Sequence, residues 1–353
     1  MRYLTIVAFV TLAFVSCKKE EDDSSSAAFD KGAMLTNLAD NTILPALADY
    51  QEKVAELKSA FDTFETDASS ANFDLLREKW QAAYLAYQTV KMYDFGPFRN
   101  YGYKGATGTF PTDTAVVESN ISSGTYNLAS AGNTVAIGFS ALDYLLYNPD
   151  AFTRLNEVGY KTYTKDVIYK LSDETTAVVS AWSSYRSTFV SSTGTETTSS
   201  FSELVNEFNR DYELAKTAKL GIPIGIQSFG IQLPEYIEAP YSGISLDLLR
   251  TNIASIHRLY NGKSHAGSSN GSGFDDYLVH LEKSALNTTI NNTFDQIITK
   301  IDTFQGTLEE EMQSNPSELE ALYNLIQSQV VNLKTDMTSS FGVLITYQDN
   351  DGD

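Results

Sequence analysis

The sequence is poor in cysteine, histidine and basic residues, and each shortage excludes something. One cysteine among 353 residues rules out an intramolecular disulfide. None of the three histidines lies in a His-Glu-x-x-His zinc motif, so metalloprotease chemistry of the usual kind has no support. Lys and Arg number 25 against 45 Asp and Glu, a formal charge of -20. Because such a surface repels phosphate groups, we exclude nucleic acid as a partner.

Segments that alternate apolar and polar residues with period two are almost absent, so β-strands are not expected. Apolar residues instead recur every three to four positions, which predicts an all-α fold of two antiparallel helical bundles, residues 29–150 and 151–353. Residues 99–132, rich in Gly, Asn, Thr and Ser, should form an irregular connection. Helices are expected over 29–66 (interrupted at Pro45), 72–92 (capped by Asn72), 160–190, 201–218, 245–260, 274–311 (broken near Asn287) and 317–341.

The N-terminus has the pattern of a targeting segment. Arg2 supplies the positive start, and the apolar run from Leu4 to Val15 is too short to span a bilayer. Ser16 and the preceding Phe-Val pair lead into the single cysteine, Cys17, as in a lipobox. We therefore predict a signal peptide over residues 1–16 and a lipid anchor on Cys17 that attaches the protein to a membrane.

Residues 17–28 form a charged, serine-rich tether with nothing to bury. Lys18, directly after the acylated cysteine, resembles the lysine of lipoproteins sent to the outer membrane. The acidic run that follows resembles surface-export signals of some Gram-negative groups. We predict an outer-membrane lipoprotein of the cell envelope, and both the periplasmic and the cell-surface side remain open.

One helical stretch, residues 133–147, carries two small polar side chains among apolar neighbours. Ser140 and Asp143 are three positions apart, so they share one face of the helix. Because an unpaired buried carboxylate costs free energy, Asp143 should have a partner or line a cavity.

A second stretch, Gly221 to Gly262, has glycines that interrupt an apolar segment, so its first part should be non-helical. It contains Glu238-Ala239-Pro240-Tyr241-Ser242, and Ser245 stands where it could cap the next helix. The simplest interpretation is a loop between the bundles.

Both stretches resemble conserved regions of the imelysin-like family. The family's Gly-x-His-x-x-Glu signature corresponds to Gly138, Ser140 and Asp143, with serine in place of histidine and aspartate in place of glutamate. Its Glu-x-Pro-[Phe/Tyr]-Ser motif corresponds to Glu238, Tyr241 and Ser242. The resemblance implies two related bundles that meet at a ligand-binding cleft. These six residues would lie at that cleft.

The resemblance also implies a role in bacterial iron uptake, and the family carries a peptidase label. A neutral hydroxyl at Ser140 is a poor ligand for iron or zinc and does not titrate near neutrality. Asp143 is then the one candidate metal ligand, and no catalytic residue is assigned. We predict a non-enzymatic binding protein for iron or another small ligand, with an envelope transporter as a partner. The alternative is a peptidase of this family.

Overall fold

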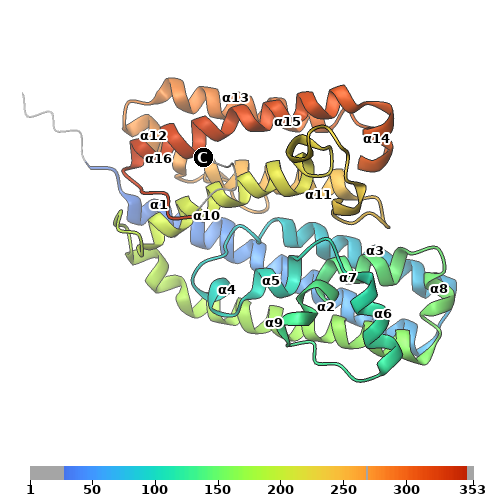
Figure 1. The fold of residues 1–353 in the computed structure, drawn as a ribbon. Coiled ribbons are helices and arrows are strands. Elements are labelled where there is room, and N and C mark those ends of the chain that lie inside the picture. The colour runs from blue at the N-terminus through green and yellow to red at the C-terminus, as the bar shows by residue number, and fades with distance from the viewer. Residues whose placement is uncertain (1–27, 268, 348–353) are drawn as a thin grey trace, which may run out of the picture.

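The computed structural model describes residues 28–267 and 269–347, and within them it contains helices and no strand. Figure 1 shows two helical layers: α2 to α9 form one, and α10 to α16 form the other. The predicted all-α fold is confirmed. The predicted signal peptide, Cys17, the tether up to residue 27 and the acidic C-terminal residues lie outside the described part of the chain.

An almost continuous helix leads from the N-terminal side into the first layer. It comprises α1 (Lys31–Asn37), a π-helical segment (Leu38–Ile43) and α2 (Leu44–Thr66). The π-helical segment ends just before Pro45, whose missing N–H removes a helical hydrogen bond. Proline therefore interrupts the α-helical geometry, as predicted, without ending the element.

The next helix, α3 (Ser70–Gln88), begins two residues earlier than predicted, and the predicted cap Asn72 is wrong. Ser69 is the N-cap, and its hydroxyl accepts a hydrogen bond from the Asn72 amide at 3.4 Å. The cap belongs to the last residue with extended backbone, and here that residue is Ser69.

The irregular connection predicted over 99–132 is largely helical, so that prediction was wrong. Short helices have too few turns to show an apolar stripe, and packing on neighbours stabilises them. The remaining helices of this layer are α4 (Pro97–Asn100), α5 (Tyr103–Gly108), α6 (Thr114–Ser123), a 3-10 turn (Ala131–Ala136), α7 (Gly138–Tyr147), α8 (Ala151–Arg154) and α9 (Val158–Ser191).

The second layer follows the prediction closely except at two places. The helix 274–311 breaks at residues 281–283 instead of Asn287, and again at 302–307. Ser245 does not cap α11, because Ile244 is the N-cap and the Ser245 hydroxyl donates to the Glu238 carbonyl. The elements are α10 (Ser200–Leu214), a π-helical segment (Ala215–Gly221), 3-10 turns (Ile226–Ser228 and Pro234–Tyr236), α11 (Ser245–Tyr260), α12 (Phe274–His280), α13 (Ser284–Ile301), α14 (Leu308–Ser314), α15 (Pro316–Val330), a π-helical segment (Val331–Met337) and α16 (Thr338–Phe341).

The two layers share one continuous hydrophobic core. The helix α9 follows the boundary predicted near residue 150, yet it packs against α2 and α7 in the first layer. The chain passes to the second layer between Ser191 and Ser200, and α3 then meets α11 across the seam between the layers. No helix among the described residues has both the length and the apolar character needed to cross a membrane.

Candidate functional site

The helix α7 begins in an unusual backbone conformation. Gly138 has φ of +73°, and a Cβ built there would lie 2.3 Å from the carbonyl oxygen of Thr107 on α5. Only glycine tolerates both the left-handed conformation and this close approach. Gly138 therefore fixes the start of the helix against α5, and its contribution to the predicted site is to position Ser140 and Asp143.

Asp143 joins the two layers. Its side chain is fully buried, and its two carboxylate oxygens accept hydrogen bonds from the backbone amides of Tyr241 and Ser242, each at 3.0 Å. Burial raises the pKa of this carboxyl to about 6, although the hydrogen bonds from Ser242 and Tyr241 act in the opposite direction. The partner expected for a buried Asp143 is thus the backbone of the loop that precedes α11.

Glu238 lies in the same loop and is also buried. Its carboxylate accepts hydrogen bonds from the Tyr84 hydroxyl at 2.8 Å and the Gln88 amide at 3.4 Å, and it forms an ion pair with Lys219. Burial lowers the pKa of Lys219 to about 8, against the attraction of Glu238. Tyr84 and Gln88 belong to α3, so Glu238 also connects the layers.

Ser140 faces a cleft of about 480 Å³ beside this seam. Its hydroxyl is buried and makes no hydrogen bond of ordinary geometry in the described chain. Such an unpaired group is costly and marks a place where a ligand atom or a water can bind. Residues that line the cleft include Phe110, Thr112, Ser140, Ile237, Tyr241 and Glu309.

The structure brings five of the six predicted site residues to one seam. Ser140 and Tyr241 line the cleft, Asp143 and Ser242 hold its wall together, and Glu238 lies behind that wall. The Tyr241 ring also packs edge-on against Tyr144 of α7, with ring centroids 5.3 Å apart.

Sequence reasoning missed three partners of Glu238. Tyr84 lies among the buried apolar and aromatic residues of α3, and Gln88 lies one turn further along the same helix. Lys219 precedes Glu238 by a non-helical segment that no periodicity describes. The one available signal was the presence of two lysines, Lys216 and Lys219, in a mostly apolar stretch before Gly221.

Metal ligands are sparse around this seam. Within residues 28–267 and 269–347 no group of three or more His, Cys, Asp or Glu side chains is arranged to hold a metal ion. His257 stacks on Phe294, with ring centroids 4.7 Å apart, and hydrogen bonds to Asn291, so it belongs to the packing of α11 against α13. The assignment of Asp143 as a metal ligand stays a prediction. The arrangement suits recognition of a small molecule through hydrogen bonds and apolar contacts.

Comparison with known proteins links this geometry to a family. The family model described as imelysin matches residues 43–336. Iron-regulated protein A of Synechococcus elongatus is 22% identical over 263 residues, which cover 70% of each chain.

Two solved structures share the fold. A protein described as an iron-regulated protein A precursor, from Parabacteroides distasonis, has a TM-score of 0.77 at 16% identity and covers 90% of this chain and 97% of its own. An imelysin-like protein from Psychrobacter arcticum has a TM-score of 0.70 at 15% identity, with the same coverage of both chains.

Proposed function

The chain belongs to the imelysin family, and from this premise we propose that it is a non-enzymatic, envelope-anchored binding protein for iron or another small ligand. The observation that carries the proposal is the unpaired, buried hydroxyl of Ser140 at a cleft of about 480 Å³. Volumes of this order are typical of small-molecule sites. The name of the Synechococcus relative, iron-regulated protein A, supports the link to iron.

The surroundings of Ser140 favour binding over hydrolysis. A serine nucleophile needs a base within hydrogen-bonding distance. The Ser140 hydroxyl makes no hydrogen bond of ordinary geometry within the described residues, and the side chain that interacts with it is the hydroxyl of Tyr84, whose pKa is raised well above its usual value by burial. The carboxylate of Asp143 is occupied by two backbone amides. A peptidase of the imelysin family remains the alternative function, and proteolysis of denatured insulin by the purified protein, lost in Ser140→Ala, would favour it.

The ligand site is tested by replacing Ser140 with alanine. We expect Ser140→Ala to weaken binding of ferric citrate by about fivefold in calorimetric titration, since one buried hydrogen bond contributes about 1 kcal/mol. Ser119→Ala, at an exposed serine of α6, is the matched control and should bind as the unmodified protein does. Parallel titrations with ferrous and zinc ions separate a chelated ligand from a bare ion. Equal affinity in all three proteins would remove the cleft from the ligand site.

Anchoring is a separate part of the proposal and rests on the lipobox at Cys17. The protein would be held in the outer membrane, on the periplasmic or the surface side, where it could pass its ligand to an envelope transporter. We expect Cys17→Ala to move the protein from the membrane fraction to the soluble fraction, whereas Ser26→Ala in the same tether should stay with the membrane. Membrane retention of Cys17→Ala would contradict a lipid anchor.

A further inference from the structure

A second, smaller pocket lies next to the cleft. Its volume is about 250 Å³, and it is formed by α3, α5 and the π-helical segment after α10. Phe110 lines both cavities, and Glu238 of the smaller one lies between Ile237 and Ala239 of the larger. Its lining is unusual for a chain with a net charge of -20, because three lysines converge there: Lys91, Lys104 and Lys219.

Two of these lysines donate a hydrogen bond to a carboxylate. Lys91 donates to Asp211 at 2.5 Å, and Lys219 is paired with Glu238. The second oxygen of Asp211 accepts a hydrogen bond from Asn252 at 2.7 Å. The carboxylate of Glu238, which lines the pocket, and that of Asp211, which binds Lys91, are therefore already engaged by a lysine and by other donors.

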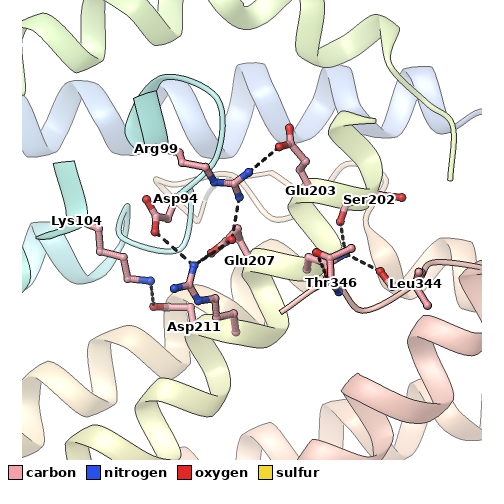
Figure 2. Close-up of polar contacts among 11 residues, drawn as sticks. Asp94, Arg99, Lys104, Ser202, Glu203, Glu207, Asp211, Leu344 and Thr346 are labelled. Atoms are coloured by element: carbon pink, nitrogen blue, oxygen red, sulfur yellow. Dashed lines mark hydrogen bonds and ion pairs between the residues drawn. The ribbon is translucent and has the colours of Figure 1, made fainter. Parts of the chain in front are cut away.

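Lys104 is the third lysine, and its ammonium group lacks a full set of partners. Figure 2 shows it extending from α5 toward Asp211 on α10, and the Nζ–Oδ1 distance is 3.7 Å. Its Nζ is buried and makes no hydrogen bond within the described residues. Burial lowers the pKa of Lys104, which is the expected response to incomplete solvation of a charge.

The other acidic groups near Lys104 are engaged elsewhere. Asp94 lies 3.7 Å from Arg210, and Glu207 accepts a hydrogen bond from Arg99 at 3.0 Å (Figure 2). These groups attract Lys104 through space but give it no hydrogen bond. Apart from the longer ion-pair contact with Asp211, the described residues offer its N–H groups no acceptor, so a water or a bound ligand can supply one.

Tyr87 provides a second unpaired donor at the same pocket. Its side chain is 2% exposed, and its hydroxyl has no hydrogen-bond partner in the described chain. A Cβ at Gly108 would lie 2.4 Å from this hydroxyl, so the glycine is what leaves room for it. Two buried donors of different chemistry, Lys104 and Tyr87, thus line one small cavity.

We propose that this pocket binds a small oxyanion, a carboxylate or a phosphate, whose oxygens accept hydrogen bonds from Lys104 and Tyr87. The three ammonium groups and the hydroxyl supply donors in excess of the acceptors on Asp211 and Glu238, so an anion satisfies both the charge and the hydrogen bonds. The pocket is distinct from the cleft at Ser140, and the proposal does not depend on the ligand assigned to that cleft.

The test is a calorimetric titration of the full chain with inorganic phosphate and, separately, with citrate, at constant ionic strength and without iron. We expect saturable binding of at least one anion, weakened about tenfold in Lys104→Met and several-fold in Tyr87→Phe. Lys165→Met, at a lysine on α9 paired with Glu65, is the matched control and should leave the affinity unchanged.

The two titrations distinguish the two classes of anion, because phosphate reports on phosphoryl ligands and citrate on carboxylate ligands. The proposal is overturned if neither anion binds saturably. It is also overturned if Lys104→Met and Tyr87→Phe bind the anion with the same affinity as the unmodified protein. Should Lys104→Met fail to fold, Tyr87→Phe alone decides, since it removes only a hydroxyl. Because the citrate of ferric citrate could also enter this pocket, the ferrous and zinc titrations of Ser140→Ala, run without citrate or phosphate, keep the failures of the two sites distinguishable.

Discussion

The carboxyl of Asp143 illustrates how a buried acid can be tolerated without a cation. Its two oxygens take up two backbone amides that would otherwise be unsatisfied where the loop meets α7. The hydrogen bonds offset only part of the desolvation, which is why its pKa lies above the ordinary value. The carboxyl of Asp143 therefore connects the two layers, and its negative charge destabilises the folded state.

This cost predicts a pH dependence. The pKa of Asp143 is about 6 in the folded protein, against 3.8 for an ordinary aspartate. The native state therefore holds the proton more tightly than the unfolded state, so stability from this group is present below about pH 4 and is lost as pH rises through about 6. In urea unfolding, we expect the unmodified protein to lose about 2–3 kcal/mol relative to Asp143→Asn between about pH 4 and pH 7. If the free energies of unfolding of the unmodified protein and of Asp143→Asn changed in parallel with pH, Asp143 would not titrate in this range.

At the scale of single residues, the sequence predicted only those contacts that follow from the chemistry of neighbouring residues. A carboxylate among apolar neighbours implied a partner for Asp143, and the family resemblance indicated the loop that carries Tyr241 and Ser242. The ion pair of Glu238 with Lys219 could not be foreseen, because it depends on how a non-helical segment turns back on itself. The same holds for the convergence of Lys91 and Lys104, which lie on different parts of the chain.

At the scale of elements, apolar periodicity identified the long helices but not their ends. The helix α11 covers the predicted residues 245–260, because its apolar stripe is uninterrupted. The N-cap prediction for α3 was wrong because both Ser69 and Asn72 are residue types that cap helices, and the sequence does not show which of them has extended backbone. The prediction of an irregular connection over residues 99–132 was wrong for another reason: the short helices there are stabilised by tertiary contacts, which the local sequence does not show.

The start of α7 gives a prediction at this scale. We expect Gly138→Ala to lower the free energy of unfolding by about 2 kcal/mol or more, since the new Cβ meets the Thr107 carbonyl in a left-handed conformation. Gly105→Ala in α5 is the control: nothing lies within 4 Å of its Cβ, and it should be neutral or stabilising by about 0.5–1 kcal/mol. Equal denaturation midpoints for the two variants would contradict this role of Gly138.

For the whole molecule, the arrangement of two layers with a seam decides where ligands can bind. The cleft at Ser140 and the pocket at Lys104 both lie where α3, α5 and α7 of the first layer face the loops of the second. The sequence predicted the all-α class and a cleft between bundles. It placed the division near residue 150, before α9, because no pattern shows which neighbour a long amphipathic helix will choose.

The passage of the chain from layer to layer at residues 192–199 has a consequence for assembly. Because Asp143, Glu238 and the α3–α11 contact join the layers without covalent bonds, residues 17–195 and 196–353 produced as separate chains should copurify as a complex. Asp143→Ala in the first fragment should weaken that complex, and fragments that elute separately would contradict the expectation. The native protein is then equivalent to two binding partners that are linked by residues 192–199, and this linker gives each partner a high effective concentration of the other. Cutting the linker makes association of the two layers a bimolecular equilibrium.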